Sequence, residues 1–454
     1  MPQPTPDAEL RVLVIGAGTG GLCLAHGLRR AGIDVQVFER DATRADGLHG
    51  YRVGIDPDGS RALRDCLPPE LYDTFVATCA KAPEYVNFLT EKRGELLSVG
   101  GFTSDDPDPV DSEKSVSRMT LRQVLLTGVE DVVSFGKVFT HYTEEPDGRV
   151  TAHFEDGTSA TGTVLVAADG SNSRVRRQYL PHAELKPLGP IGITGKVPLT
   201  PETRALLTPK MQRGISMVYA PHAYFCIFHV MEFPWDEGGR PKTGIGSADT
   251  ELLEAWPGLT YDNSRDYVDW GLVTQSRQLP ANVMEMKSPD LYRLVAERTT
   301  DWHPDFRRLF ALADPNSCFP INIRTSVPIP QWETTRITLL GDAIHTMTPG
   351  RGVGANTALR DARLLCRRLV QARDGELPLL DAIRQYETTM IDYAFDAVRK
   401  SARSGGGSGP SAPVIGRALL GLLRTAMRVV NHLPAVKNKM AEGHRSYRGH
   451  GREE

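Results

Sequence analysis

The sequence has few of the features that would indicate secretion, a membrane or nucleic acid. Its six cysteines are scattered, without a CxxC pair or a histidine at metal-ligand spacing, so we expect reduced thiols and no zinc site. Lysine and arginine (53) nearly balance aspartate and glutamate (56), and the net charge of -3 gives no reason to expect a nucleic-acid partner. No run of 18 apolar residues occurs, so we expect no stable membrane insertion. The polar start MPQPTPDAE lacks the basic and apolar regions of a secretory signal, and we therefore expect a cytoplasmic protein.

The composition that remains is that of a globular protein. The chain has 454 residues, of which 40% are hydrophobic and 24% charged. This length is too great for one ordinary domain, so two or three are expected.

A glycine-rich turn near the start predicts a dinucleotide site. Residues 11–15 (RVLVI) favour a buried parallel strand, GAGTGG follows at 16–21, and residues 22–32 have helical apolar spacing. A second strand at 35–38 leads into an acid, Glu39. Together these elements form a βαβ unit of the kind that binds a dinucleotide.

Each glycine of this turn has a physical role. Gly16 permits the tight turn, Gly18 lets the backbone approach a pyrophosphate, and Gly21 lets the helix pack on the strand. The helix N-terminus offers free N–H groups to the phosphates. Glu39 lies 18 residues after Gly21, where an acid accepts from a ribose 2′-hydroxyl, and its neighbour Arg40 is a further candidate. The acid suits FAD or NAD, and disfavours NADP at this site.

Two later segments place an acid after a strand. In residues 163–179, an apolar strand at 164–168 leads into Asp169 and a helix that begins with Arg174. In residues 336–369, a strand at 337–340 leads into Asp342, a glycine-rich loop and a long helix that begins near Val353.

The three segments GAGTGG, ADGSNSRVR and GDAIHTMTPGRGVGANTALRDA, in this order, resemble the class A flavoprotein monooxygenases of the para-hydroxybenzoate hydroxylase type. The resemblance spans roughly residues 10 to 400. It implies an α/β fold with a discontinuous Rossmann-like FAD-binding domain, a mixed antiparallel-sheet substrate domain and a C-terminal helical segment. The predicted boundaries are FAD-binding parts 1–84, 115–185 and 331–403, substrate parts 85–114 and 186–330, a linker 404–413, and a C-terminal helix and tail 414–454.

The resemblance also implies roles for residues of the third segment. Asp342 would accept from the ribityl hydroxyls of FAD, and Pro349 would shape the wall beside the flavin. The backbone of the next helix start would approach the isoalloxazine ring; its candidates are Gly352, Gly354, Ala355 and Asn356. Val353 stands where the family usually has a polar residue. His345 is expected to be a buried, hydrogen-bonded histidine and not a catalytic base.

Arginines and one further acid complete the implied cofactor site. Arg52, in GYRVGI, resembles the arginine that reaches the flavin and the pyridine nucleotide, and its guanidinium suits phosphate. Arg118 resembles the arginine that heads a helix contacting FAD, with Arg122 as the alternative. Asp169 and Arg174 resemble residues that close the flavin site and support NAD(P)H. Two further arginines are expected to be solvated, namely Arg176 and Arg177.

The remaining chain predicts a second sheet and a C-terminal helix. Residues 215–220 and 223–233 alternate as antiparallel strands with one buried face. In the family such a sheet forms one wall of the substrate pocket, and the possible lining residues are Tyr224, Phe228, His229 and Met231. Residues 379–403 are expected to be helical and to precede a flexible linker at 404–410. An amphipathic helix at 414–430 is expected to dock on the flavin domain, with a membrane-surface or partner helix as the alternative, and the last dozen residues to be disordered.

The resemblance implies a reaction in which NAD(P)H reduces FAD and the reduced flavin captures O₂ as a C4a-hydroperoxide. The expected outcome is hydroxylation of an aromatic or polycyclic small molecule by a monomer or homodimer. Baeyer–Villiger insertion and epoxidation stay open. A flavin-dependent halogenase is disfavoured because the WxWxIP motif is missing, and an FAD dehydrogenase or a non-catalytic FAD-binding protein are further alternatives.

Overall fold

The structure is a computed structural model that describes residues 10–44, 46, 52–101, 109–234, 266–404 and 413–448. Gly50 and Tyr51, which precede Arg52, and most of the predicted linker lie outside the described residues.

A five-stranded sheet carries the nucleotide-binding segments. All its neighbouring strands are parallel. Its strands in spatial order are β17 (Ile337–Leu339), β11 (Val164–Ala167), β1 (Arg11–Ile15), β2 (Asp34–Phe38) and β7 (Val133–Ser134). Because parallel strands share one carboxyl edge, the segments that follow β1, β2, β11 and β17 meet there.

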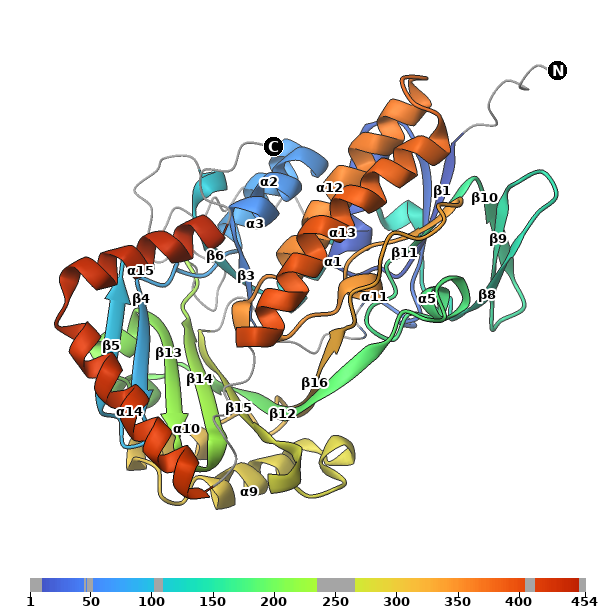
Figure 1. Ribbon diagram of the computed structural model, residues 1–454. Coiled ribbons are helices and arrows are strands. Elements are labelled where there is room, and N and C mark those ends of the chain that lie inside the picture. Colours follow the sequence, from blue (N-terminus) through green and yellow to red (C-terminus); the bar gives the residue numbers. More distant parts are fainter. Residues whose placement is uncertain are drawn as a thin grey trace.

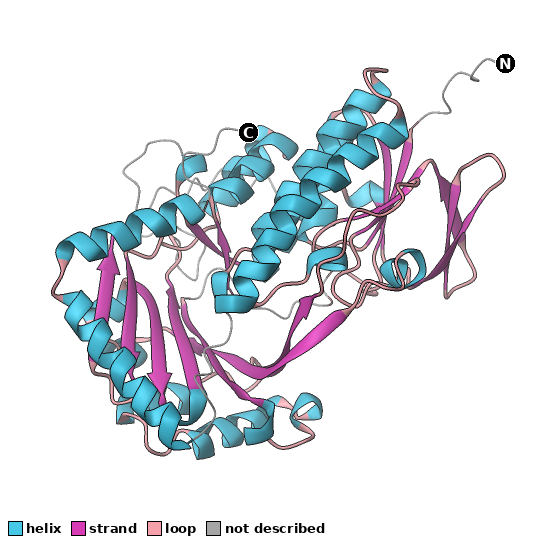
Figure 2. Ribbon diagram, viewed as in Figure 1, coloured by secondary structure: helices cyan, strands magenta, loops and turns pink. Residues whose placement is uncertain are grey.

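Helices cover this sheet in layers (Figures 1 and 2). α1 (Thr19–Arg30) packs against α12 (Gly354–Arg373), and α12 packs against both α2 (Pro57–Cys66) and α13 (Leu379–Ser404). α1 buries nearly all of its length, including three glycines, because it is enclosed between the sheet and its neighbouring helices. The remaining helices of this region are α3 (Pro69–Ala77), α4 (Arg118–Leu126), α5 (Arg174–Tyr179) and α11 (Asp342–His345).

A seven-stranded mixed sheet forms the second part of the molecule. Its neighbours are antiparallel except for the parallel pair β13 and β4. Its strands in spatial order are β16 (Phe319–Ser326), β12 (Leu185–Pro198), β15 (Tyr267–Gln275), β14 (Tyr224–Met231), β13 (Gly214–Ala220), β4 (Tyr85–Thr90) and β5 (Glu95–Gly100). The mixed sheet confirms the predicted fold class, whereas the exact domain boundaries stay a prediction.

One face of this sheet is covered by helices and forms the second hydrophobic core. The core is built by Phe228 and Trp270 of the sheet and by Phe306 and Phe310 of a covering helix. The helices of this region are α6 (Pro201–Ala205), α7 (Pro209–Gln212), α9 (Ser288–Arg298) and α10 (Pro304–Ala311).

Two smaller sheets complete the described part of the fold. β3 (Arg52–Ile55) pairs antiparallel with β6 (Lys114–Ser117) to form a ribbon. A three-stranded antiparallel sheet is formed by β8 (Phe139–Glu144), β9 (Val150–Phe154) and β10 (Ser159–Gly162). Among the helices of the described residues, none is both long and apolar enough to span a membrane.

The C-terminal helices lie on the seven-stranded sheet, which corrects the expectation that the helix at 414–430 docks on the flavin domain. α14 (Pro413–Asn431) and α15 (Pro434–Tyr447) both pack against β5, as Figure 1 shows in red. The Asn431 side chain accepts from the Ser98 backbone N–H at 3.1 Å, and Arg424 pairs with Glu91. The outer strands of the sheet present an apolar strip that includes Val86 and Phe88, and α14 buries it. α15 ends at Tyr447, so five of the last dozen residues are helical, and residues 449–454 lie outside the described part.

Candidate functional site

In the glycine turn after β1, Gly18 has room for a side chain, whereas Gly16 and Gly21 do not. A Cβ atom at Gly16 would lie 2.5 Å from the Ala168 carbonyl oxygen, and Gly16 has a φ of +108° that favours glycine. At Gly21 a Cβ atom would lie 2.3 Å from the Gly16 carbonyl oxygen. At Gly18 it would meet only one atom within 4 Å, at 3.9 Å, and no side chain caps the helix that begins there. The turn therefore leaves an open cradle in front of free helix N–H groups.

Glu39 holds this cradle in place. Its buried carboxylate accepts from the Ala17 N–H at 2.8 Å and from the Asp41 N–H at 3.0 Å. Arg122 lies behind it, with a nitrogen 2.9 Å from the Asp41 carboxylate and 3.7 Å from that of Glu39. Arg40 is exposed beside it. The Arg122 guanidinium is thus held by the carboxylates that follow β2.

Asp342 lies in a recess at the carboxyl end of β17. Its side chain is accessible, yet the enclosing protein raises the pKa of its carboxyl group, and the positive charges nearby, Arg118 among them, only partly oppose this. Arg118 is exposed at the start of α4. The recess thus brings an acid and a cation together, and of the two arginines of α4 it is Arg118 that faces Asp342.

A buried carboxylate behind Asp342 fixes the loop. Asp361 of α12 accepts from the Gly341 N–H at 2.8 Å and from the Tyr393 hydroxyl at 2.6 Å, and it lies 2.6 Å from the His345 ring nitrogen Nε2. Burial opposes protonation of His345, but the Asp361 charge outweighs it, so the pKa of His345 is raised. This confirms that His345 is buried and hydrogen-bonded.

The N-terminus of α12 has no side-chain cap, and Asn356 in its first turn is hydrogen-bonded to the backbone at the end of β3. Val353 precedes the helix without a side-chain cap, and the first turn holds no acid. The Asn356 amide donates to the Gly54 carbonyl at 2.8 Å and accepts from the Asp56 N–H at 3.0 Å. Gly352 is exposed in the left-handed conformation, with φ of +62°. The side chain of Asn356 therefore acts on the protein backbone, while the helix N–H groups stay available.

The other predicted residues of this loop lie near the helix start. Pro349 is exposed at the start of a short 3₁₀ turn, and Gly354 and Ala355 are half-buried in the first turn of α12. They surround the open end of the helix, as the resemblance implies.

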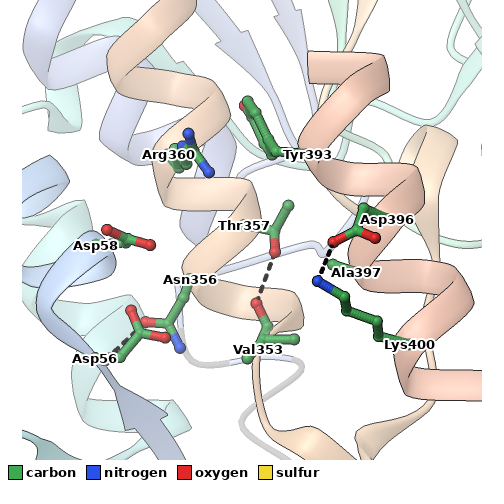
Figure 3. A pocket seen from close by; sticks show the side chains of 10 residues that line it. All are labelled: Asp56, Asp58, Val353, Asn356, Thr357, Arg360, Tyr393, Asp396, Ala397 and Lys400. Atoms are coloured by element: carbon green, nitrogen blue, oxygen red, sulfur yellow. Dashed lines mark hydrogen bonds and ion pairs between the residues drawn. The ribbon is translucent and has the colours of Figure 1, made fainter. Parts of the chain in front are cut away.

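A pocket lies between α2, α12 and α13 (Figure 3). Asp56 and Asn356 form its base, and the ion pair of Asp396 with Lys400 (2.7 Å) lies on its α13 side. Burial raises the pKa of Asp56 to about 7, with Arg448 opposing. The pocket touches the start of α12 from the side of α2 and α13.

The segment after β11 holds two of the predicted site residues, Asp169 and Arg174. Asp169 accepts from the Arg174 N–H at 2.8 Å, and its second oxygen, Oδ1, has no hydrogen-bond partner among the described residues. The Arg174 guanidinium points away, to Glu155 and to the Phe139 carbonyl of the β8–β10 sheet. Arg174 therefore acts through its backbone at this point.

Arg176 was expected to be solvated, and this is wrong. It is buried and donates to the Ala343 carbonyl at 2.6 Å and to the Ser171 carbonyl at 2.9 Å. It thereby joins the loop after β11 to the loop after β17.

Arg52 lies where the two parts of the molecule face each other. From β3 it donates to the Ser115 hydroxyl at 3.1 Å. Burial lowers the pKa of Arg52 to about 10, as does the neighbouring Arg448, whereas Glu113 and Asp269 raise it. Arg52 thus connects the β3–β6 ribbon electrostatically to strand β15.

Arg448 extends the C-terminal helices to this place. It is buried and makes a bidentate ion pair with Glu113, at 2.7 and 2.8 Å. It also donates to the carbonyls of Arg351 and Gly352, at 3.2 and 3.1 Å. The end of α15 therefore contacts the glycine-rich loop before α12.

The four predicted lining residues lie on two different faces of the seven-stranded sheet. Tyr224 and Phe228 belong to the core under α9 and α10, and Phe228 stacks on Phe306 with ring centroids 5.1 Å apart. His229 and Met231 alternate with them along β14, and Met231 packs with Tyr267 outside that core. Tyr224 and Phe228 are thus core residues, Met231 is buried in a second, smaller apolar cluster, and His229 is buried on the same face as Met231.

Comparison with known proteins agrees with this geometry. The family described as FAD binding domain matches residues 9–53 and 295–400. The chain is 31% identical to a candidate FAD containing monooxygenase from Photorhabdus luminescens subsp. laumondii, whose structure superposes with a TM-score of 0.74 over 88% of this chain and 98% of that one. The chain belongs to the class A FAD-dependent monooxygenases.

Two other members place the chain further. It is 34% identical over 403 residues to the dual O-methyltransferase/FAD-dependent monooxygenase CTB3 of Cercospora beticola, covering 85% of this chain and 45% of that protein. The chain thus spans less than half the length of this relative. The structure of HpxO from Klebsiella pneumoniae, complexed with FAD and uric acid, shares the fold at 22% identity, with a TM-score of 0.72 over 96% of each chain.

The residues present fit the FAD of this monooxygenase family. Gly18 leaves an open cradle in front of α1, and α12 begins with free N–H groups. Asp342 has an accessible side chain just after the carboxyl end of β17. These residues would hold the pyrophosphate, the pyrimidine edge of the flavin and the ribityl chain.

Sequence reasoning missed three residues of this monooxygenase's site. Asp361 lies within the third motif, in its final RDA, and its helical position was a usable signal. Arg448 and Asp269 had no signal, because their contacts join segments that are far apart in sequence.

Proposed function

We propose that this chain is an FAD-dependent, NAD(P)H-using monooxygenase that hydroxylates an aromatic or polycyclic small molecule. The observation that carries the proposal is the position of Arg52. It stands on the ribbon beside the flavin loop, and its charge reaches Asp269 and His229 of the sheet. The cofactor residues and a buried polar wall would therefore lie on either side of Arg52.

The chain's own residues would bind and orient the reactants. Glu39 suits the adenosine ribose, Asp342 the ribityl chain, and the start of α12 the edge of the flavin where negative charge develops on reduction. Bound FAD, once reduced by NAD(P)H, would supply the activated oxygen, and the seven-stranded sheet would exclude water from the substrate.

The names of the relatives support the reaction class. CTB3 is named as a monooxygenase in one of its two activities, and HpxO was captured with uric acid, a planar heterocycle. The chain matches less than half of CTB3, so its activity needs its own measurement. The free cysteines suit a cytoplasmic enzyme.

The test is anaerobic reduction of the purified yellow protein by NADH and by NADPH, with and without hydroxylated naphthalenes. We expect bleaching of the flavin that an aromatic ligand accelerates. The proposal would be contradicted if neither nucleotide reduced the flavin, either alone or with any of the aromatics. Reduction that is followed by reoxidation to peroxide alone, with every aromatic, would favour an FAD dehydrogenase or oxidase.

A further inference from the structure

Three polar residues form a row across adjacent strands of the seven-stranded sheet. In the antiparallel register, Lys196 of β12 lies opposite Asp269 of β15, and Asp269 lies opposite His229 of β14. Residues directly opposite in antiparallel strands point to the same face. The row therefore lies on the face opposite the core of Phe228 and Trp270.

Two members of the row are buried without the partners that buried polar groups normally have. His229 is 3% exposed and Asp269 is 8% exposed. Among the described residues, neither ring nitrogen of His229 and not the Oδ1 atom of Asp269 has a hydrogen-bond partner. A buried polar group without a partner destabilises a fold, so these two residues on one face of the sheet call for an explanation, and a ligand that supplies the partners is one.

Two cations lie near the buried members of the row, namely Lys196 of the row itself and Arg52 of β3. The Lys196 ammonium lies 4.7 Å from the ring centroid of Tyr267 and 4.0 Å from the Met119 sulfur of α4. Arg52 faces it from β3. Burial raises the pKa of Asp269 to about 7, with Lys196 and Arg52 opposing, and burial together with Arg52 lowers the pKa of His229.

The same face continues as an apolar surface beside the row. Ile215 of β13 lies opposite His229, and Met217 lies opposite Ile227 of β14. The side chains of Ile215, Met217 and Ile227 are only half-buried, in contrast to the closed core on the other face. A planar hydrocarbon body would fit along them while its polar edge meets the row.

We propose that Lys196, Asp269 and His229 bind the polar edge of the substrate, and that the substrate is an aromatic molecule carrying a hydroxyl group next to a carbonyl oxygen. Lys196 and Arg52 can only donate, so they require an acceptor on the ligand. Asp269 and neutral His229 can accept, so they require a hydroxyl donor. Neighbouring strands are about 4.8 Å apart, so one edge of a ligand can meet a cation and an acceptor of the row at the same time. This assignment rests on the proposed function.

The ligand test uses the FAD-loaded protein and three probes. 1-Hydroxy-2-acetonaphthone carries both groups, its 1-methoxy analogue lacks the donor, and 2-acetonaphthone lacks the hydroxyl. Binding is followed by the change in flavin absorbance or by calorimetry. We expect the two analogues to bind about tenfold more weakly than the hydroxyketone. Equal binding of all three probes, or no binding of the hydroxyketone, would overturn the assignment.

The variant test separates a ligand role from a structural one. His229→Leu, Asp269→Asn and Lys196→Met should each weaken binding of the hydroxyketone about tenfold. The matched controls His182→Leu, Asp301→Asn and Lys186→Met change exposed residues and should bind like the parent. His229→Leu should also melt no lower than the parent, because it removes an unpartnered buried group. A lower melting temperature with unchanged binding would assign His229 to the core instead.

The two proposals can fail separately. A protein that prefers the hydroxyketone but whose flavin is not reduced by NAD(P)H keeps this assignment and loses the proposed function. A protein whose flavin is reduced but which binds the probes without preference keeps the function and loses the assignment.

Discussion

The flavin-side loops and the wall of the seven-stranded sheet differ in how fully their buried polar side chains are paired, although Asp169 Oδ1 on the flavin side also lacks a partner among the described residues. On the flavin side, Glu39, Asn356 and Asp361 each bind two or more groups of the protein. On the sheet, His229 and Asp269 leave ring and carboxyl atoms without partners in the described residues.

This difference indicates that the flavin-side loops are held rigid before a ligand binds, whereas the sheet wall is completed by its ligand. A cofactor that stays bound requires loops whose shape is set before it arrives, and hydrogen bonds to backbone provide that. A substrate that comes and goes must supply the missing partners itself, so its wall keeps them unsatisfied. The predictions below test each half of this comparison.

Gly18→Val should give the largest effect on FAD binding. Gly18 has extended backbone that valine adopts easily, and its Cβ would enter open space, so the fold should persist. The added methyl groups would fill the cradle for the pyrophosphate and weaken FAD binding about 100-fold. FAD content and circular dichroism check this, with Gly421→Ala in open space on α14 as the control. A folded, fully yellow variant would show that the cradle lies elsewhere.

Asp361→Ala should destabilise the protein itself. It removes the carboxylate that joins Gly341, His345 and Tyr393 in a buried site, at a cost of about 3 kcal/mol in the free energy of unfolding. Denaturant unfolding measures this. Asp374→Ala, at the exposed end of α12, should change stability by about 0.5 kcal/mol or less. Equal stabilities of the two variants would deny that the flavin-side loop is held in advance.

Asp342→Ala should separate binding from folding. Its carboxylate faces an open recess, so its loss should weaken FAD binding by about 2 kcal/mol, or about 30-fold, and leave the melting temperature of the FAD-free protein unchanged. Fluorescence titration with FAD measures the first and thermal unfolding the second. Retention of FAD at the parent's affinity would contradict the cofactor role and would leave Asp342 as a residue that only begins the short helix α11.

Arg448→Met should loosen the contact between the C-terminal helices and the flavin loop. It leaves Glu113 without its bidentate partner, and we expect a loss of about 1.5 kcal/mol, reduced because the chain end can open locally. Limited proteolysis and thermal unfolding report it, with the exposed Arg445→Met as control. Identical cleavage of both variants would mean that α15 is not fastened by this ion pair.

The smallest expected effect is a pH dependence from Asp269. Burial raises its pKa in the folded state to about 7, above the ordinary value of 3.8. Its contribution to stability is therefore present below about pH 4 and lost as the pH rises through about 7. Asp269→Asn should melt about 2 °C higher relative to the parent at pH 8 than at pH 5. The carboxyls of Asp56 and Glu387 titrate in the same window in both proteins, so the difference isolates Asp269. No difference between the two pH values would mean that Asp269 ionises normally.

Local features of the site could be predicted from the sequence, whereas distant contacts could not. The strands at 11–15, 164–168 and 337–340 were expected within one residue, because each is a short apolar run before a glycine or an acid. The burial of Arg176 escaped prediction, since it depends on the Ala343 carbonyl, which is 167 residues away.

The polar row shows the same limit on the substrate side. His229 could be selected from its place in an alternating strand. Its pairing with Asp269 depends on a strand register that no local pattern reveals. The docking of α14 was misjudged for the same reason, because an amphipathic stripe shows that a face is buried and not which surface covers it.

The most direct test of the central claim is oxygen incorporation. The FAD-loaded protein, supplied with NADH or NADPH, is incubated with 1-hydroxy-2-acetonaphthone under ¹⁸O₂, and the products are examined by mass spectrometry. The account predicts a product that gains one ¹⁸O atom, with less product from Asp269→Asn and Lys196→Met. Substrate-stimulated nucleotide oxidation without any labelled product, for this ketone and a panel of related hydroxyarenes, would contradict it.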